Sequence, residues 1–146
     1  MSVVNHYGSL LDCHASYSIA FAIDVNATRD GGTTQRMMCA CEGGQHGIVA
    51  QRRSVGQSVV CRRVDAPGSF VFPLVVKQRN LLTPSYPALR VVLEDCRDQC
   101  IARGVTNLAM PRLCCGRDKL EWEHVFETVR SVFAETLIEI HVYVVV

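Results

Sequence analysis

The chain has 146 residues, of which 49% are hydrophobic and 20% are charged. These values suit one globular domain with an ordinary core, and they exclude a fibrous protein, a disordered chain and a pair of domains. Lys and Arg number 15 against 14 Asp and Glu, so the net charge of +1 gives no general attraction for nucleic acid or an anionic membrane. The arginine pairs Arg52/Arg53 and Arg62/Arg63 are interpreted as solvated strand-edge charges, with a local basic track for nucleic acid as the alternative.

The eight cysteines are interpreted as free, small apolar residues. Residues 1–7 show no basic segment and no long apolar stretch follows, so we expect an intracellular chain, in the cytoplasm and/or nucleus, with reduced thiols. The cysteine spacing does not match a zinc site, and we expect no metal and no cofactor; a metal-stabilised interaction domain is the weaker alternative. No apolar run reaches the ~20 residues of a membrane span, so no membrane partner is expected.

Three runs typical of strands lie in the first half of the chain. Ser18–Val25 is short and mostly apolar, which favours a buried strand, and the polar stretch Asn26–Arg36 after it is predicted to be a loop. Val59–Val64 and Ser69–Val76 are separated by Asp65–Gly68. This turn-forming tetrapeptide predicts a hairpin between the two runs.

Helices and strands alternate in the second half. A helix is predicted from Thr83-Pro84 to Gly104, because proline opens it, apolar residues recur at helical spacing and glycine ends it. Val105–Met110 is predicted to be a brief strand. The loop Arg112–Lys119 then leads into a helix with one apolar face over Trp122–Phe133, and Ile138–Val146 is predicted to be the last strand.

This order of elements predicts the α/β class, with a central mixed sheet covered by helices on both faces. Ligands bind such sheets at the carboxyl ends of the strands, where the loops Asn26–Arg36 and Arg112–Asp118 both begin. Small residues in both loops allow backbone N–H groups to approach an anion. The second loop is expected to run directly into a helix N-terminus, whose dipole favours negative charge. Two such loops side by side suit a diphosphate.

Two charged residues are candidates for the chemistry. Lys77 ends the apolar run VFPLVVK at the rim of the predicted sheet, where a partly desolvated lysine can attack a sugar aldehyde or carbonyl carbon; the alternative is a surface lysine. Asp118 lies where the second loop becomes a helix, and the alternative there is a helix cap. An amine and a carboxylate in one cleft can serve as nucleophile and acid/base partner.

Several segments carry a more specific pattern. AMPRLCCGRDKLEWEHV, from Ala109 to Val125, contains a Pro-Arg, a Gly/Cys-rich loop, an Asp and a Leu-x-Trp helix start, and LVVKQRNLLTPSYPAL, from Leu74 to Leu89, contains a strand ending in lysine and a Pro-x-Tyr helix start. Both resemble the macrodomain enzymes of the terminal ADP-ribose protein glycohydrolase type. Gly8–Asp12 and Ala22–Gly32 resemble the opening strand and the ribose-facing loop of macrodomains generally. The resemblance implies one macrodomain over residues 1–146, with three α/β/α layers.

The resemblance also implies an activity. In that family the lysine matching Lys77 attacks the anomeric carbon of the distal ribose, and the aspartate matching Asp118 helps to resolve the covalent sugar adduct. This implies a hydrolase that removes ADP-ribose from modified acidic side chains, from O-acetyl-ADP-ribose or from an ADP-ribosylated nucleobase. ADP-ribose and ADP-ribosylated protein are the implied partners, with ADP-ribosylated nucleic acid as a further candidate. A non-catalytic reader macrodomain that binds ADP-ribose is the alternative.

The implied ligand-binding residues come from three parts of the chain. Loops matching Asp30–Thr33 and Leu113–Arg117 surround the diphosphate and distal ribose, and Leu10 with its neighbours flanks the adenine. Asn26 matches an asparagine that touches the distal ribose, with a turn residue as an equal alternative, and Asp24 faces that ribose or caps the strand end. The full set is Ser9, Leu10, Asp24, Asn26, Gly31, Gly32, Thr33, Leu113, Cys114, Cys115, Gly116 and Arg117.

The chain departs from the family pattern at three positions. Ser9 stands where an aspartate commonly binds the adenine amino group, and it brings no charge. Cys114 stands where glycine is usual, and its Cβ restricts both the backbone angles and the close approach of a ligand. Asp30 is unfavourable near a diphosphate unless its side chain turns away. These changes leave the catalytic pair intact and are expected to alter ligand affinity.

Overall fold

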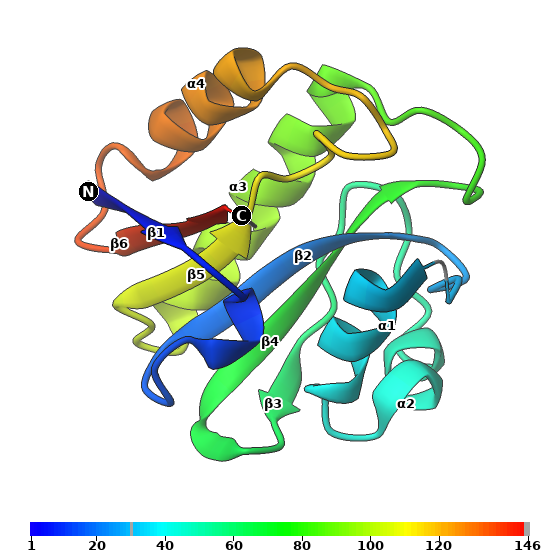
Figure 1. The fold of residues 1–146 in the computed structure, drawn as a ribbon, viewed down its shortest axis with the longest axis horizontal. Helices are drawn as coiled ribbons and strands as arrows, with labels where there is room; N and C mark the ends of the chain where they lie inside the picture. The colour runs from blue at the N-terminus through cyan, green and yellow to red at the C-terminus, as the bar shows by residue number, and fades with distance from the viewer. Residues whose placement is uncertain (30, 145–146) are drawn as a thin grey trace.

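The protein contains one mixed sheet of six strands (Figure 1). The computed structural model describes residues 1–29 and 31–144. The strands are β1 (Ser2–Tyr7), β2 (Ser18–Asp24), β3 (Cys61–Arg63), β4 (Ala66–Lys77), β5 (Asn107–Pro111) and β6 (Glu139–Val144). Their order across the sheet is β1-β6-β5-β2-β4-β3, and all neighbours run parallel except β3, which is antiparallel to β4.

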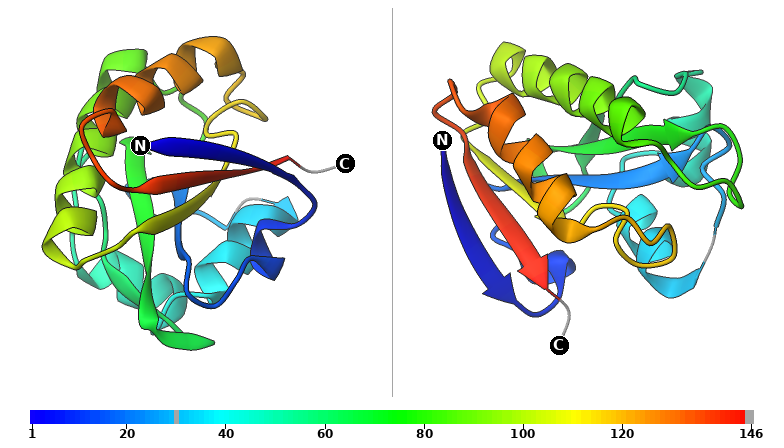
Figure 2. Two further views of the ribbon diagram at one scale, coloured as in Figure 1. Left: turned by 90° about the vertical axis from the view of Figure 1, so that its left-hand side faces the viewer. Right: turned by 90° about the horizontal axis from the view of Figure 1, so that it is seen from above.

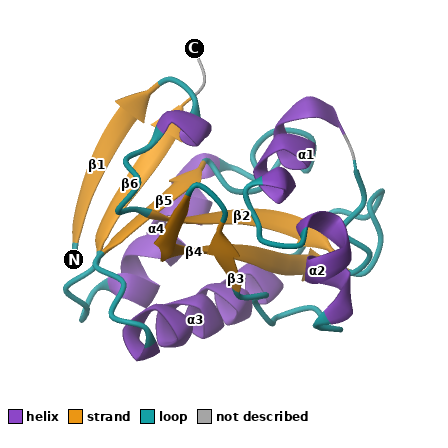
Figure 3. Cartoon of the chain, turned by 90° about the horizontal axis from the view of Figure 1, so that it is seen from below, coloured by secondary structure: helices purple, strands orange, loops and turns teal. Residues whose placement is uncertain are grey.

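Helices cover both faces of this sheet, which confirms the predicted three-layer α/β/α architecture (Figures 2 and 3). On one face, buried residues such as Leu89 and Val125 join α3 and α4 to the sheet, and on the other face Met37 and Ile48 do the same for α1 and α2. The helices are α1 (Gly31–Cys39), α2 (Gly44–Ala50), α3 (Tyr86–Ala102) and α4 (Trp122–Phe133), with a short 3-10 helix, η1, at Leu10–Asp12.

The two strands at the centre of the site, β2 and β4, are apolar along most of their length because helices cover both of their faces. Phe21 and Phe72 are fully buried on these strands. The two strands are parallel, and Asp24 at the end of β2 pairs with Lys77 at the end of β4, after a shift of the register between Ile23 and Asp24. Two of the predicted site residues are therefore brought to the same rim of the sheet.

Helix α1 corrects the prediction of a loop over Asn26–Arg36. The stretch GGTTQR has the low helix propensity of glycine and threonine, which favours a loop when the sequence is considered alone. In the structure Met37 and Met38 pack into the core on the α1 face of the sheet, and this burial holds the whole segment helical. Only residues 26–29 of the described chain remain a loop ahead of α1.

The resemblance matched Gly8–Asp12 to the opening strand of macrodomains, and this prediction was wrong. Gly8–Asp12 is not a strand: Leu10–Asp12 forms η1, and Ser9 caps it by accepting a hydrogen bond from the backbone N–H of Leu11. The opening strand is β1, which lies beside β6. Neither β1 nor α2 was predicted. Both carry many exposed residues, so they lack the continuous apolar runs that identified β2 and β4.

Other boundaries shift by a few residues. Helix α3 begins at Tyr86 instead of Pro84, because the Ser85 hydroxyl accepts a hydrogen bond from the N–H of Ala88 and forms the N-cap. The predicted hairpin is present as β3 and β4, but β4 begins at Ala66, inside the predicted turn. Of the predicted last strand, Glu139–Val144 is β6, and residues 145–146 lie outside the described part of the chain.

Arg63 corrects the interpretation of the arginine pairs as solvated charges. Its side chain is 2% exposed and donates hydrogen bonds to the backbone carbonyls of Cys13, His14 and Tyr17, and to the carboxylate of Asp65. Arg63 therefore ties the segment between η1 and β2 to β3. Because its guanidinium is turned inward, Arg62 and Arg63 do not form a continuous basic track.

All eight cysteines are free, and six of them are buried, as expected for small apolar residues. Residues 1–29 and 31–144 contain no group of three or more His, Cys, Asp or Glu side chains that could hold a metal ion. The same described residues include no helix with the length and apolar character needed to cross a membrane.

Candidate active site

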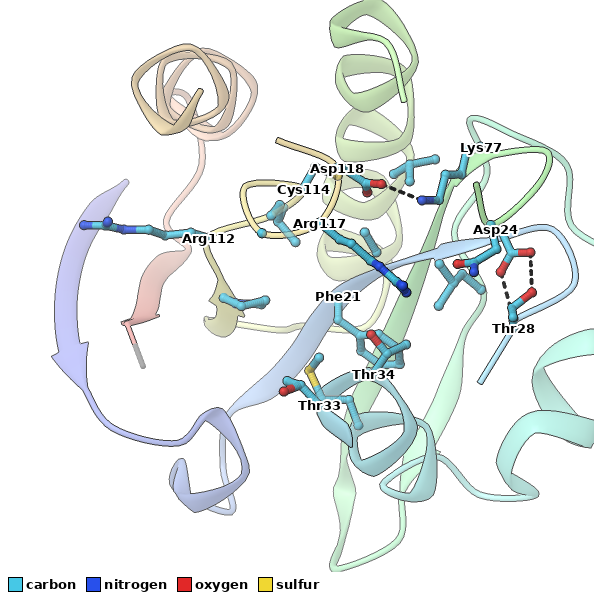
Figure 4. A pocket seen from close by; sticks show the side chains of 18 residues that line it. Phe21, Asp24, Thr28, Thr33, Thr34, Lys77, Arg112, Cys114, Arg117 and Asp118 are labelled. Carbon is cyan, nitrogen blue, oxygen red and sulfur yellow. Dashed lines mark hydrogen bonds and ion pairs between the residues drawn. The ribbon is translucent and has the colours of Figure 1, made fainter. Parts of the chain in front are cut away.

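A cavity of about 380 Å³ opens at the carboxyl ends of β2, β4 and β5 (Figure 4). Its walls come from these strand ends, from the first turns of α1 and from the loop between β5 and α4. This is the rim at which parallel α/β sheets bind ligands, because successive loops leave the sheet on the same side. The two loops singled out in the sequence therefore face each other across one cavity.

Lys77 and Asp118 meet at one end of this cavity. The Lys77 Nζ donates a hydrogen bond of 2.5 Å to the Asp118 Oδ1, and the two side chains are 10% and 16% exposed. A partly buried ion pair at this distance fixes both side chains, because each charge would lose hydration without a partner. The structure therefore places a lysine nitrogen and a carboxylate oxygen in direct contact.

The sequence predicted that the loop carrying Asp118 runs directly into a helix. In the structure it does not. Helix α4 begins at Trp122, and its N-cap is Glu121, so Asp118 is not a helix cap. The helix that starts beside the cavity is α1, whose Thr33 and Thr34 line the wall. The expectation that the second loop leads directly into a helix is therefore wrong, and it is the first loop that leads into a helix at the cavity.

Cys114 gives the loop of Asp118 its shape. It adopts φ = 60°, in the left-handed region that favours glycine, and its carbonyl accepts a hydrogen bond of 2.9 Å from the N–H of Leu120. The side chain is 9% exposed and lines the cavity. Burial raises the pKa of the Cys114 thiol to about 12, the Asp118 carboxylate adds to this rise, and the Lys77 ammonium opposes it. This shift favours the protonated form of the thiol at neutral pH.

Asp24 holds the first loop in place. Its Oδ1 accepts a hydrogen bond of 2.7 Å from the backbone N–H of Thr28, and its Oδ2 accepts one of 2.7 Å from the Thr28 hydroxyl. Asp24 is buried, and both of its carboxylate oxygens serve this loop. Of the two roles considered from the sequence, the geometry favours the structural one at the strand end. Asp24 still borders the cavity.

A second hollow of about 290 Å³ adjoins the main cavity. Ser9 and Leu10 lie in its wall, together with Tyr143 from β6. The two hollows share Thr33, Met37 and Pro111, so they form one elongated surface. The less polar hollow lies at one end and the Lys77–Asp118 pair at the other, which suits an elongated ligand with a flat apolar group and a remote reactive carbon.

Most of the predicted ligand-binding residues line one of these two hollows, and a few do not. Leu113, Cys114, Gly116 and Arg117 line the main cavity with Thr33. Asn26 is exposed in the turn after β2 and is not among the residues that line either hollow. Cys115 donates its S–H to the Leu113 carbonyl at 3.2 Å and borders a different surface depression. Gly31 and Gly32 begin α1, and Asp30 lies outside the described residues.

Four polar residues of the cavity wall, Thr28, Thr34, Asn80 and Arg112, were not among the predicted site residues. Thr28 and Thr34 belong to the first loop and α1, and Asn80 follows β4. Thr28 and Asn80 lie within four positions of a strand that ends at this rim, whereas Thr34 lies in the first turn of α1, and proximity to the strand ends was the available signal. It was too weak to separate them from ordinary loop residues, because polar residues follow almost every strand.

Solved structures with this architecture include macrodomains. The macrodomain of Mycobacterium tuberculosis DarG superposes with a TM-score of 0.84 at 14% identity, covering 97% of this chain and 96% of that one. The macrodomain of Thermus aquaticus DarG gives 0.81 at 15% identity, with 97% and 99% covered. These likenesses show the fold.

Sequence similarity defines the family more closely. The chain is 33% identical over 136 residues to the human ADP-ribose glycohydrolase OARD1, covering 93% of this chain and 87% of the relative. The chain therefore belongs to the macrodomain family, in the terminal ADP-ribose glycohydrolase group that includes this relative. No protein-family model matches the chain.

Proposed function

We propose that this protein is an ADP-ribosyl hydrolase that releases ADP-ribose from modified acidic side chains, with Lys77 as the nucleophile. The observation that carries the proposal is the contact of 2.5 Å between the Lys77 Nζ and the Asp118 Oδ1 inside the cavity. The relative that is 33% identical is named as an ADP-ribose glycohydrolase, and this supports hydrolysis in preference to binding alone. ADP-ribose and ADP-ribosylated protein are the proposed ligand and substrate.

The elongated shape of the site supports one orientation of ADP-ribose, with adenine at one end and the distal ribose at the other. With adenine in the hollow near Ser9 and Leu10, the diphosphate passes the shared residues Thr33 and Met37, and the distal ribose reaches Lys77. The α1 wall offers the hydroxyl groups of Thr33 and Thr34 as hydrogen-bond donors to phosphate oxygens. This order puts the anomeric carbon beside the amine.

The first chemical step follows from the contact between the two side chains. Asp118 accepts a proton from the Lys77 ammonium, and the resulting amine attacks the anomeric carbon of the distal ribose. A bond forms between Nζ and this carbon, and the bond from the carbon to the acceptor oxygen breaks, with its electron pair leaving on the oxygen. The released acceptor is a carboxylate, which needs no proton to depart.

The second step frees the enzyme. Asp118 first releases its proton to solvent, and it then accepts a proton from water while the water oxygen bonds to the anomeric carbon and the Nζ–carbon bond breaks, with its electron pair remaining on the nitrogen. The proton then passes from Asp118 to the freed amine. Free ADP-ribose leaves, and the amine and carboxylate return to the paired state. The two steps use only Lys77 and Asp118 of the side chains that line the cavity.

The chain offers a clean test, because it contains only two lysines, Lys77 and Lys119. Wild type, Lys77→Ala and the control Lys119→Gln are titrated with ADP-ribose by calorimetry and assayed on Glu/Asp-linked ADP-ribosyl protein. Lys119 is exposed and does not line the cavity. We expect Lys77→Ala to lose turnover and keep most of its binding, while Lys119→Gln behaves like wild type. Equal turnover in Lys77→Ala would overturn the mechanism.

Trapping the intermediate identifies the nucleophile directly. The adduct on Nζ opens its sugar ring to an imine, and borohydride reduces this form to a stable amine. Reduction during turnover, followed by peptide mass spectrometry, should place the sugar adduct on the peptide of Lys77 and not on that of Lys119. Binding with neither turnover nor adduct in wild type would show a reader of ADP-ribose. Parallel assays with O-acetyl-ADP-ribose and with ADP-ribosylated DNA define the acceptor.

A further inference from the structure

The turn after β4 carries two leucines that the fold does not bury. Leu81 is 89% exposed and Leu82 is 50% exposed. The backbone N–H of Leu82 donates a hydrogen bond of 3.1 Å to the carbonyl of Arg79, which closes the turn. Both ends of the segment are fixed, because β4 ends at Lys77 and Ser85 caps α3. The leucines are therefore held at a defined place outside the core.

This turn adjoins the reactive end of the cavity. Asn80, directly before Leu81, lines the cavity with Lys77 and Asp118. In Figure 1 the green segment between β4 and α3 projects beyond the tip of the β4 arrow. In the proposed orientation ADP-ribose fills the path from the hollow of Ser9 to Lys77, so the acceptor on the anomeric carbon extends from this end. The turn therefore lies beside the path of the acceptor.

The two leucines distinguish this part of the rim from the loops around it. Within the rim loops that the structure describes, residues 25–29, 78–85 and 112–121, large apolar side chains are exposed only at positions 81 and 82. Single exposed leucines are common on protein surfaces, but two in one turn form a small apolar patch that a ligand can cover. The distal ribose and the diphosphate are polar, so the acceptor is the part of the substrate that this patch fits.

The composition of the turn favours a peptide over a nucleic acid as the acceptor. Residues 78–84 read QRNLLTP, with one arginine, no lysine and no aromatic residue. A nucleic-acid strand is bound by several basic groups and by aromatic side chains on which its bases stack. In contrast, apolar side chains that flank a modified glutamate or aspartate would be removed from water against Leu81 and Leu82. The one charge, on Arg79, is positive and does not oppose an acidic segment.

We propose that Leu81 and Leu82 form a docking surface for the acceptor peptide, on which apolar side chains next to the modified Glu or Asp pack while Lys77 attacks the anomeric carbon. This inference rests on the proposed function, since it takes an ADP-ribosylated acidic side chain as the substrate. The surface takes no part in the chemistry. It raises kcat/KM for peptide substrates and has no effect on O-acetyl-ADP-ribose, whose acceptor is too small to reach it.

Substrates with a large and a small acceptor test this surface. Wild type, Leu81→Ser, Leu81→Ser/Leu82→Ser and the control Leu137→Ser are assayed on O-acetyl-ADP-ribose and on a peptide whose ADP-ribosylated glutamate is flanked by leucines. Leu137 is 95% exposed and precedes β6, at the end of the sheet opposite the cavity. We expect the double variant to lose about 5- to 30-fold in kcat/KM on the peptide, as when roughly one leucine side chain is left unburied, and less than about twofold on O-acetyl-ADP-ribose. Leu137→Ser should match wild type on both.

A second peptide tests the chemistry of the partner. Replacing its flanking leucines with serine should lower kcat/KM of wild type about as much as the double substitution does, and the double variant should no longer distinguish the two peptides. Turnover of an ADP-ribosylated DNA oligonucleotide should be the same in all four proteins. The thermal unfolding midpoint shows that each variant is folded. Leu81→Ser alone removes no core packing, so it gives the same comparison with a smaller change to the turn.

The outcomes separate this inference from the proposed function. Wild-type turnover of the leucine-flanked peptide by the leucine variants would overturn the docking surface, and so would an equal loss on the peptide and on O-acetyl-ADP-ribose, since the turn would then act through Lys77. A loss confined to ADP-ribosylated DNA would also overturn it and assign the turn to nucleic acid. Each of these results leaves the hydrolase proposal standing. Absence of turnover by wild type on every one of these substrates would remove the proposed function itself.

Discussion

The side chains of Lys77 and Asp118 touch at 2.5 Å although 41 residues separate them in the sequence. Lys77 ends β4, and Asp118 lies in the loop that joins β5 to α4. In the sheet, β2 lies between β4 and β5, so the lysine and the loop of Asp118 come from opposite sides of one central strand. The site therefore depends on the order of strands in the sheet, and on the loop that carries Asp118 back over β2.

The contact between Lys77 and Asp118 leads to a prediction about turnover. Asp118→Asn keeps the shape of the side chain and removes the proton acceptor, so turnover should fall by about 10²- to 10⁴-fold, the usual contribution of general acid–base catalysis. ADP-ribose binding should change little. Single-turnover kinetics on ADP-ribosylated protein measures the loss, and Asp98→Asn, an exposed carboxylate on α3, is the control. Wild-type turnover in Asp118→Asn would contradict the assigned role.

Cys114 leads to a prediction about stability. A left-handed backbone costs a residue with a Cβ about 1–2 kcal/mol relative to glycine. Cys114→Gly relieves this strain but loses the buried thiol, so the free energy of unfolding should change by less than about 1 kcal/mol. Cys114→Ala keeps the strain and also loses the thiol, so it should be less stable than the glycine variant. Urea unfolding measures which of the two variants is more stable. A more stable alanine variant would show that the turn is not strained.

Arg63 should be essential for folding. Replacing it with leucine leaves the carbonyls of Cys13, His14 and Tyr17 without their donor, and the cost should be about 3 kcal/mol or more. Arg62→Leu on the exposed side of the same strand should stay within about 0.5 kcal/mol of wild type. Chemical denaturation of both variants makes the comparison. Similar stability in the two would mean that the buried hydrogen bonds contribute little.

The burial of His141 leads to a prediction of how the stability of the protein depends on pH. It is 2% exposed, its Nδ1 lies 2.8 Å from the His6 Nε2, and its Nε2 lies 3.0 Å from the Asn107 Oδ1 and 3.2 Å from the Glu139 Oε1. A neutral ring with its proton on Nε2 is compatible with these contacts. Burial lowers the pKa of His141, the charge of His6 lowers it further, and the Glu139 carboxylate opposes the shift. The ring stacks on Tyr17 at a centroid distance of 4.1 Å.

The lowered pKa of His141 determines the direction in which the free energy of unfolding changes with pH. As pH falls through about 6.5, the unfolded chain takes up a proton at this position before the folded protein does, so the free energy of unfolding decreases by up to about 1.4 kcal/mol per pH unit. The contribution is fully present above the unfolded pKa. Urea unfolding at several values between pH 7.5 and pH 5 should show a smaller slope for His141→Gln than for wild type. Exposed His46, replaced by glutamine, should leave the slope unchanged.

Several features of the protein could be predicted from residue patterns because their physical causes are local. Continuous apolar runs predicted β2 and β4, the spacing of Leu89 and Leu93 predicted α3, and Lys77 at the end of an apolar run predicted a polar group at the rim of the sheet. The resemblance in the second half of the chain extended this to the macrodomain family. Helix α1 was missed because its glycines and threonines favour a loop until Met37 and Met38 are buried.

Only the tertiary structure decided which of the candidate residues act together. Asp24 and Asn26 are two positions apart, yet Asp24 turns inward to hold Thr28 and Asn26 faces outward. Arg62 and Arg63 are adjacent, yet one is exposed and the other is buried among backbone carbonyls. The sequence determined the strands, the helix faces and the chemical groups available to the site. Burial, strand order and loop path determined which of those groups meet, because these depend on contacts between residues far apart in the chain.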